Sequence, residues 1–295
     1  MVDITHKRNS LRTAIAQATV KVSQQATIRA IEEHLVPKGN VFEMAKTAGL
    51  FAVKRTSDMI PDCHPLPVEY TKVSYEIEDL SIHIQMEVRT IYRTGVEVEA
   101  MHGVSVVALT MYDMLKPIDK GIEIQNIKLI GKKGGKSDFK NIIPPDFPIT
   151  YLQCTDAGAE ETNGSRQKQV ITDLLSSHHL HLQHYASIPN EQSVIRESIQ
   201  QHQHNGLILL TSKTKSAKAV LEELLDQPIA SIGEMLRQYK AERNPGAFPD
   251  LFLGGWINDT LVVSLPGKSN DLQDALIALF PYVLALWKKE KKGND

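Results

Sequence analysis

The residues best suited to chemistry in this 295-residue chain include a cysteine and a histidine in a proline-bounded loop. Cys63 and His64 lie between Pro61 and Pro65, which keep the segment out of a helix. An imidazole fixed on a rigid loop can act as a general acid or base near neutral pH. The residues alone leave a second interpretation open, in which His64 only caps a neighbouring strand.

Acidic side chains mark both ends of an expected helix. Glu97 and Glu99 open it, where carboxylates can simply complement the positive helix end, and their two-residue spacing predicts different roles. Asp113 and Lys116 are three positions apart near its other end, so they share a face and can pair. Their apolar neighbours predict a desolvated pair suited to proton transfer, and an ordinary surface ion pair is the alternative.

A basic, glycine-containing turn follows later in the same half. Lys132 and Lys133 precede Gly134-Gly135, and Lys136 comes directly after the two glycines. Glycines allow close approach of the backbone and lysines supply positive charge, a combination that suits a polyphosphate. A solvated basic turn fits the same residues equally well.

These groups need a scaffold, and apolar spacing in the first half predicts an α+β domain. Two period-2 runs joined by a short polar link predict a hairpin with one covered face and one wet face. The apolar phase of a later strand slips at Asn126, which predicts a β-bulge. We expect a helix over 11–34, a short helix over 42–50, the hairpin over 72–78 and 82–89, a largely buried helix over 97–116, and a strand over 122–130.

A glycine pair and three prolines predict a boundary near 140–148, with a first domain at 1–143 and a second at 148–295. Short apolar strands then alternate with helices, which predicts a parallel sheet covered on both faces, the doubly wound α/β class. The expected strands are 149–154, 180–185, 207–210 and 261–265, and the expected helices are 163–176, 190–203, 214–225 and 270–288.

Composition excludes several classes of protein. A net charge of -2 argues against a nucleic-acid binder, and no run reaches the roughly 18 apolar residues of a membrane span. Two cysteines allow neither a disulfide framework nor a CxxC zinc site, so we expect a reducing cytoplasm. The histidines of the second half show no regular ligand spacing and predict no metal site; they are His178, His179, His181, His184, His202 and His204.

Together and in this order, the motifs of the first half resemble the cyclic pyranopterin monophosphate synthase (MoaC) family. The runs IPDCHPLP at 60–67 and TGVEVEAMHGVSVVALTMYD at 94–113 carry the resemblance, which covers nearly all of residues 1–140. It implies a ferredoxin-like α+β fold and a hexamer built from dimers, with the active site at a subunit interface. The implied reaction converts a cyclised dihydro-GTP derivative to cyclic pyranopterin monophosphate and releases pyrophosphate, with neither a cofactor nor a metal ion.

The same resemblance implies roles for individual residues, since the reaction needs proton transfers and cations against a triphosphate. Asp113 and Lys116 would be the central acid/base pair, and Lys38 and Lys132 would complete the catalytic set. The implied substrate-binding residues are Asp62, Cys63, His64, Glu97, Val98, Glu99, Lys54 and Arg55, with Lys54 and Arg55 as ligands of the phosphates or the ring. Two positions depart from the family pattern, because Asp62 stands where an apolar residue is usual and Val98 stands where Met is usual.

The second half resembles, over fewer residues, the MogA/MoaB family of molybdopterin adenylyltransferases. The matching segments are Thr155-Asp156, Asn163-Gly164, residues 233–237 and residues 264–267. That family has a Gly-Gly-Thr-Gly loop and an aspartate after its third strand. This chain instead reads TSKTK at 211–215, with no acid before Glu222. Side chains at these positions would keep a pyrophosphate from the backbone, and the magnesium anchor is missing.

Three hypotheses follow. The first is an active synthase whose second domain serves assembly or pterin binding, with downstream enzymes of the molybdopterin pathway as candidate partners. In its hexamer, C-terminal trimers would cap the two ends of the core. The second is a fully bifunctional enzyme that also adenylylates molybdopterin, against which the lost glycine loop argues. The third is a non-catalytic scaffold, against which the retained acids and bases argue.

Overall fold

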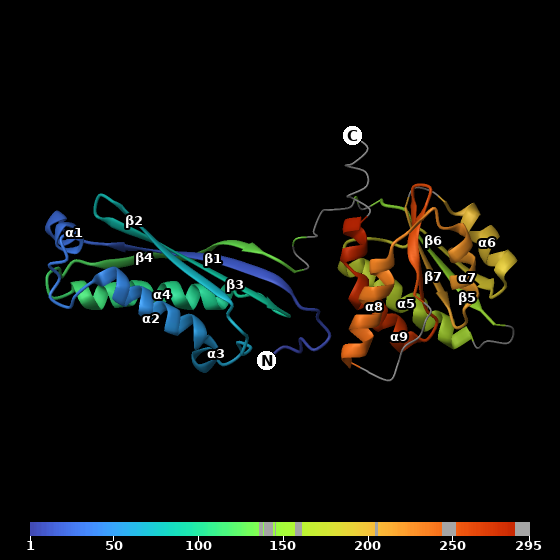
Figure 1. The fold of residues 1–295 in the computed structure, drawn as a ribbon, viewed down its shortest axis with the longest axis horizontal. Coiled ribbons are helices and arrows are strands. Elements are labelled where there is room, and N and C mark those ends of the chain that lie inside the picture. The colour runs from blue at the N-terminus through green and yellow to red at the C-terminus, as the bar shows by residue number, and fades with distance from the viewer. Residues whose placement is uncertain are drawn as a thin grey trace. The chain divides into compact units, whose positions relative to one another are not determined.

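The computed structural model describes residues 1–135, 138, 144, 146–156, 161–203, 206–243 and 252–286, without the side chains of residues 161–164. The chain forms two compact units, Met1–Asp138 and Phe139–Asp295, each with its own hydrophobic core (Figure 1). Most of the expected boundary at 140–148 lies outside the described residues.

The N-terminal unit is an antiparallel sheet covered on one face by helices. The strand order is β2-β3-β1-β4, and every neighbouring pair of strands is antiparallel. The strands are β1 (Ser10–Lys21), β2 (Tyr70–Glu78), β3 (Ser81–Tyr92) and β4 (Glu123–Lys133), and the helices are α1 (Gln25–Glu32), α2 (Val41–Lys54), α3 (Thr56–Met59) and α4 (Glu97–Leu115). The expected α+β class, the hairpin and the helix near residue 97 are confirmed.

The expected helix over 11–34 is wrong, because its first half is the central strand β1. Alanines have a high helix propensity, but Ala14, Ala16 and Ala18 alternate with half-exposed residues and are buried. Hydrogen bonds to β3 on one side and β4 on the other hold the segment extended. Tertiary pairing therefore outweighs local propensity, and only α1 remains helical.

Helix α4 packs against β1 and α2, and two glycines set the approach of α2 and α4. A Cβ at Gly103 would lie 2.4 Å from Val53 Cγ2, and a Cβ at Gly49 would lie 2.4 Å from Val107 Cγ2. These contacts show that the two helices run antiparallel. The expectation that α4 is largely buried holds for one face only, because Leu109 is 58% exposed on the other.

Strand β4 contains the bulge that the sequence predicts at Asn126. Gln17 pairs with Lys128, but Thr19 pairs with Gln125, so β4 has one extra residue there. Asn126 adopts a left-handed φ of 55°, which asparagine tolerates better than most residues.

The C-terminal unit is a doubly wound α/β fold, as expected. The strand order is β6-β5-β7-β10-β9-β8; the first four strands are parallel, and β9 is antiparallel to both of its neighbours, β10 and β8. Helices α5, α8 and α9 line one core, and α6 and α7 line the core on the other face. The strands are β5 (Ile149–Thr155), β6 (His184–Pro189), β7 (Leu207–Ser212), β8 (Gln227–Pro228), β9 (Gly254–Ile257) and β10 (Thr260–Pro266), and the helices are α5 (Glu161–Ser177), α6 (Gln192–Gln201), α7 (Ser216–Leu224), α8 (Ala230–Arg243) and α9 (Ser269–Leu279).

Two expectations for this unit are wrong. The strand expected at 180–185 lies at His184–Pro189, because Leu180 instead closes α5 by donating its N–H to Leu175 O, with His179 in the left-handed region. The helix expected over 270–288 is interrupted, because Pro281 cannot donate the hydrogen bond that would continue α9. Helix α8 and strands β8 and β9 were not predicted.

Candidate active site

The expected site residues of the N-terminal unit lie at the two ends of α4. Glu97 and Glu99 lie in its first turn, and Asp113 lies in its last. At a rise of about 1.5 Å per residue, Glu99 and Asp113 are separated by roughly 21 Å along the helix axis. Within one chain the residues therefore form two separate groups.

The Asp113 group consists of Lys38, Asp113 and Lys116. Lys38 Nζ lies 2.6 Å from Asp113 Oδ2 and 2.9 Å from the backbone oxygen of Asp113. Lys116 Nζ lies 2.8 Å from Asp113 Oδ1, so each carboxylate oxygen accepts from one ammonium group. Hydrogen bonds from Lys116 and then Lys38 lower the pKa of Asp113 to about 2, and the Asp113 carboxylate raises the pKa of Lys116.

The expected desolvation of this pair is wrong for the single chain. The side chains of Lys38, Asp113 and Lys116 are 40%, 52% and 49% exposed. The reason is the direction of the helix face, since the neighbouring Met111 and Met114 point into the core while Asp113 points away from it. An exposed triad of this kind offers an ionised base between two cations.

The Glu99 group lies at the other end of α4, where Cys63 donates a hydrogen bond from Sγ to Glu99 Oε1 at 3.1 Å. Glu99 is only 2% exposed, and burial raises its pKa. Burial, followed by the hydrogen bond to Glu99, raises the pKa of the Cys63 thiol to about 12. Cys63 is therefore a thiol, and not a nucleophilic thiolate, at neutral pH.

The loop that carries Cys63 is tied to the start of the chain. His64 Nε2 lies 2.8 Å from the backbone oxygen of Val2, and the amino group of Met1 lies 2.9 Å from Asp62 Oδ1. Asp62 points into solvent with 88% of its side chain exposed. The alternative of a histidine that only caps a strand is not observed, because His64 contacts a chain segment outside the sheet.

Lys132 of β4 contacts the first turn of α4. Lys132 Nζ lies 3.3 Å from Glu97 Oε1, so Glu97 and Glu99 have different partners, as their spacing predicts. Gly134 and Gly135 both adopt positive φ, the conformation that favours glycine. Lys133 is exposed, and Lys136 lies outside the described residues.

Three expected site residues have no polar contact with either group. Lys54 and Arg55 are exposed at the end of α2, with the Arg55 guanidinium carbon 5.7 Å from the Phe51 ring centre. They follow Val53, which packs on Gly103, so they lie toward the Glu99 end of α4. Val98 is also exposed there.

The sequence analysis missed His102, which lies one helical turn after Glu99. Its Nδ1 is 3.2 Å from Thr56 Oγ1, and its charge acts on Glu99. The three-residue spacing from Glu99 was a usable signal, since it places the two side chains on one helix face.

In the C-terminal unit, the carboxyl edge of the parallel strands carries a hydroxyl and amide network. Asn190 donates to Asp156 Oδ1 at 2.8 Å and to Thr214 Oγ1 at 3.0 Å, while Ser212 donates to Asn190 Oδ1 at 3.1 Å. The segment after β7 lies at the carboxyl edge of the parallel strands, the edge at which doubly wound sheets generally bind ligands. Lys213 and Lys215 on this segment are exposed.

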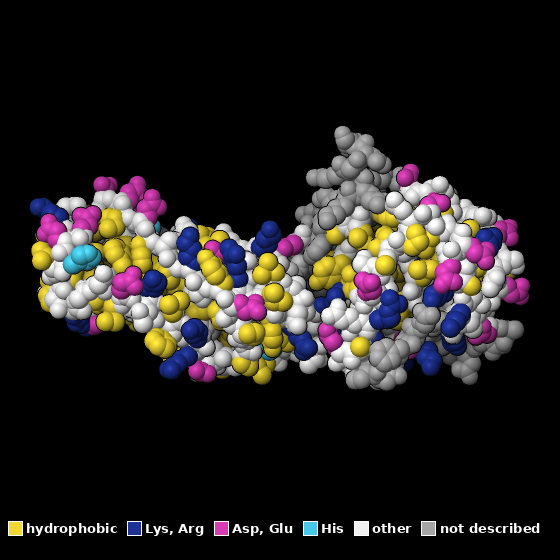
Figure 2. Space-filling view, in the orientation of Figure 1, with side chains coloured by type: hydrophobic (Ala, Val, Ile, Leu, Met, Phe, Trp, Pro, Cys, Tyr) yellow, Lys and Arg dark blue, Asp and Glu magenta, His cyan; other side chains and the backbone are white. Residues whose placement is uncertain are grey.

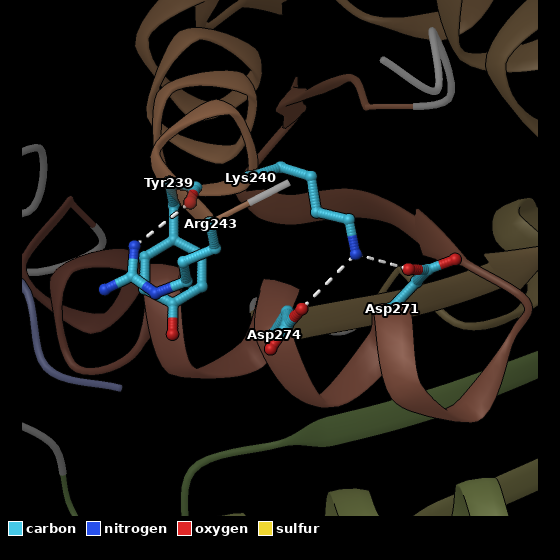
Figure 3. A network of polar contacts seen from close by, with 5 residues as sticks. All are labelled: Tyr239, Lys240, Arg243, Asp271 and Asp274. Carbon is cyan, nitrogen blue, oxygen red and sulfur yellow. Dashed lines mark hydrogen bonds and ion pairs between the residues drawn. The ribbon is translucent and has the colours of Figure 1, made fainter. Parts of the chain in front are cut away.

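A second polar cluster of this unit joins two helices and lies outside that edge. Lys240 of α8 contacts Asp271 Oδ1 at 2.5 Å and Asp274 Oδ2 at 3.3 Å on α9, while Arg243 stacks on the Tyr239 ring (Figure 3). Burial opposes the charge of Lys240, but the two carboxylates outweigh it and raise its pKa. This contact fastens α8 to α9.

No metal centre is found among the described histidine, cysteine, aspartate and glutamate side chains, and His204 lies outside them. No helix in the described part of the chain is long and apolar enough to cross a membrane.

Comparison with known proteins covers both units. The model of the MoaC family matches residues 1–135. A "Molybdenum cofactor biosynthesis bifunctional protein" from Synechococcus elongatus is 31% identical over 319 aligned residues, which cover 100% of this chain and 99% of the relative. A "Cyclic pyranopterin monophosphate synthase" from Nitratidesulfovibrio vulgaris is 46% identical over 139 residues, which cover 46% of this chain and 86% of the relative. A crystal structure of "Molybdenum cofactor biosynthesis protein B" aligns with 50% of this chain and 98% of its own at 20% identity and a TM-score of 0.42.

Proposed function

The chain belongs to the family of bifunctional molybdenum cofactor biosynthesis proteins, and on this basis we propose that its N-terminal unit carries out the cyclic pyranopterin monophosphate synthase reaction with the two groups on α4. The enzyme is a lyase of molybdenum cofactor biosynthesis that converts a cyclised dihydro-GTP derivative to cyclic pyranopterin monophosphate and releases pyrophosphate. With α1, α2 and α3 together as the first crossover, the β-α-β-β-α-β order of this unit supports assignment to the ferredoxin-like class.

The observation that carries the proposal is the carboxylate of Asp113 held between two ammonium groups. Asp113 is ionised and Lys116 is protonated at neutral pH, so each holds the form needed to accept or to donate a proton, although their ion pair weakens both roles in the free protein. Lys38 and Lys116 can also stabilise negative charge that develops on the sugar or on departing pyrophosphate. Lys132, Lys54 and Arg55 supply further cations toward the Glu99 end, for the triphosphate or the ring.

A single small substrate cannot touch both groups of one chain, so we propose that each active site combines two copies. The exposed residues Val98, Leu109 and Tyr112 form one stripe with the half-exposed Met101 and Ser105, at helical spacings of three and four. When two such stripes meet in antiparallel orientation about a twofold axis at Ser105, residue i of one copy lies opposite residue 210 − i of the other copy. Figure 2 shows hydrophobic side chains at the surface of this unit.

This arrangement would place Asp113 opposite Glu97 of the second copy, which brings the two groups together. The exposed Phe51 and Met44 of α2 would extend the contact area. The dimers would then assemble into the hexamer that the family resemblance implies, with C-terminal trimers at its ends. A cytoplasmic location and the domain limits 1–143 and 148–295 stay predictions.

For the C-terminal unit we propose a MogA/MoaB-like fold that binds pterin or supports assembly without adenylyl transfer. Ser212, Thr214 and Asn190 occupy the strand edge with hydrogen-bonded side chains, where a nucleotide phosphate would need bare backbone. The alternative is full bifunctionality, which the name of the full-length relatives favours.

The synthase proposal is tested by incubating the full-length protein with the cyclised dihydro-GTP derivative and measuring cyclic pyranopterin monophosphate and pyrophosphate. We expect both products from the wild-type chain and from Glu76→Ala, a control at an exposed position of β2. We expect little of either from Asp113→Ala. Equal turnover by Asp113→Ala and the control would overturn the assignment of Asp113.

A further inference from the structure

Glu99 is buried, unlike every other acidic residue of the candidate site. It is 2% exposed, whereas the side chains of Asp62 and Asp113 are 88% and 52% exposed. Glu97, two positions earlier on the same helix end, pairs with Lys132. Removing a carboxylate from water is unfavourable unless hydrogen bonds or a cation compensate, so the partners of Glu99 decide its state.

Those partners are too few for a buried anion. Oε1 accepts one hydrogen bond, from the Cys63 thiol at 3.1 Å, and a thiol is a weak donor. Oε2 is buried, and no described residue gives it a hydrogen-bond partner. Among the described residues of the same chain, no lysine or arginine forms an ion pair with Glu99. A buried polar atom left without a partner needs an explanation, and in a candidate site a catalytic role is one.

The surrounding charges act in opposite directions. Burial favours the neutral acid, and so does the nearby Glu97 carboxylate. The Cys63 hydrogen bond, the backbone at the start of α4 and His102 favour the anion. Burial dominates, and the pKa of Glu99 lies above the ordinary value of a glutamate. Cys63 stays a thiol because its own pKa is raised, so it continues to donate to Oε1.

We propose that Glu99 is a neutral carboxylic acid in the free protein, and that its Oε2 hydroxyl donates a hydrogen bond to an acceptor oxygen or nitrogen on the ring of the substrate. Cys63 is the positioning residue, because its thiol makes Oε1 the acceptor and leaves the proton on Oε2. No covalent bond forms or breaks in this contact. The substrate part of the proposal rests on the synthase function, whereas the protonation state does not.

The protonation state is tested on the free full-length protein by infrared difference spectroscopy between wild type and Glu99→Gln. We expect the C=O band of a protonated carboxyl at neutral pH in wild type, its loss in Glu99→Gln, and its retention in the control Glu97→Gln. The band should disappear as pH rises. The proposal is overturned if Glu99 shows only a carboxylate band at neutral pH, and if the protonated band appears only when the pH is lowered to the ordinary range of glutamate, near 4.3.

The role of Cys63 is tested by the same titration in two variants. Cys63→Ala removes a hydrogen bond that favours the anion, so the band should persist to higher pH than in wild type. Cys63→Ser keeps a donor, and its titration should lie closer to wild type. A merely structural role for Cys63 predicts no shift in either variant, and that result contradicts the positioning role.

Kinetics test the contact with substrate. Glu99→Gln keeps a neutral hydrogen-bond donor, so we expect kcat/KM to fall by about tenfold, against about 100-fold for Glu99→Ala. Equal losses in the two variants contradict the donor role. Failure of the wild-type protein to form product would overturn the synthase proposal but would leave the infrared result unaffected, so the two failures can be distinguished.

Discussion

Lys38 and Asp113 lie 75 residues apart in the sequence, yet Lys38 Nζ is 2.6 Å from Asp113 Oδ2. Lys38 lies just before α2 and Asp113 lies in the last turn of α4, and the antiparallel packing of these helices at Gly49 and Gly103 brings the two side chains together. A lysine from the loop before α2 and an aspartate from α4 thus form one group at the surface.

We expect Asp113→Ala and Lys116→Ala each to lower kcat by roughly 10²–10⁴-fold without unfolding the protein, because both are exposed and both serve proton transfer. The double variant should be little worse than either single variant, since the paired groups work as a unit. Steady-state kinetics with circular dichroism as the folding control checks this. If the fold-losses in kcat of the two single variants multiply in the double variant, Asp113 and Lys116 do not act as a unit.

Lys132→Ala should raise KM more than Lys54→Ala does. Lys132 lies two residues before the Gly134-Gly135 turn, where both glycines have positive φ and where lysine and glycine together suit a phosphate, whereas Lys54 lies at the exposed end of α2. Measurement of KM and kcat for both variants tests the difference. An unchanged KM with a lowered kcat for Lys132→Ala would assign that lysine to the chemical step.

Asp119→Ala should destabilise the protein by about 2–4 kcal/mol, because it leaves buried donors without an acceptor. Asp119 is 2% exposed and accepts from Ser23 N and Oγ, Thr27 Oγ1 and Gly121 N. Although burial opposes its charge, these hydrogen bonds lower its pKa. The stabilisation by the Asp119 carboxylate is therefore fully present above the ordinary pKa of an aspartate, about 3.9. It is lost as the pH falls through the lowered pKa of Asp119 in the folded protein. Urea unfolding at several pH values measures it, and a variant as stable as wild type would contradict it.

The C-terminal unit should not adenylylate molybdopterin. When the full-length chain is incubated with molybdopterin, ATP and magnesium, we expect no adenylylated pterin, because side chains fill the edge after β7. Weak pterin binding without product would fit a retained pocket with exposed Lys213 and Lys215. Product at the rate of an intact adenylyltransferase would overturn this and support the bifunctional alternative.

Much of the fold follows from the sequence because alternation and helical spacing survive in the folded chain. The hairpin, α4 and the bulge at Asn126 were predictable, since each has a period or a break in period that local sequence displays. Strand β1 was not, because its alanines favour a helix until β3 and β4 pair with it. The strand expected to begin at Leu180 was wrong for a similar reason, because the backbone hydrogen bond from Leu180 to Leu175 closes α5.

Some features of the candidate site also follow from the sequence, whereas others depend on tertiary packing. The residue types and their order point to acid/base and phosphate chemistry, and the roughly 21 Å between Glu99 and Asp113 already follows from the length of the expected helix. The pairing of Lys38 with Asp113, and of Cys63 with Glu99, depends on tertiary packing and has no local signal. The exposure of Asp113 depends on which face of α4 meets the core.

The central claim is that each active site combines the Asp113 group of one copy with the Glu99 group of another. The most direct test mixes the inactive variants Asp113→Ala and Glu99→Ala, dissociates and reassembles them together, and measures synthase activity. A dimer of one copy of each variant holds one intact site and one doubly damaged site, so random assembly should restore about a quarter of wild-type activity. Each variant put through the same treatment alone should stay inactive. A mixture no more active than the separate variants would contradict the shared site.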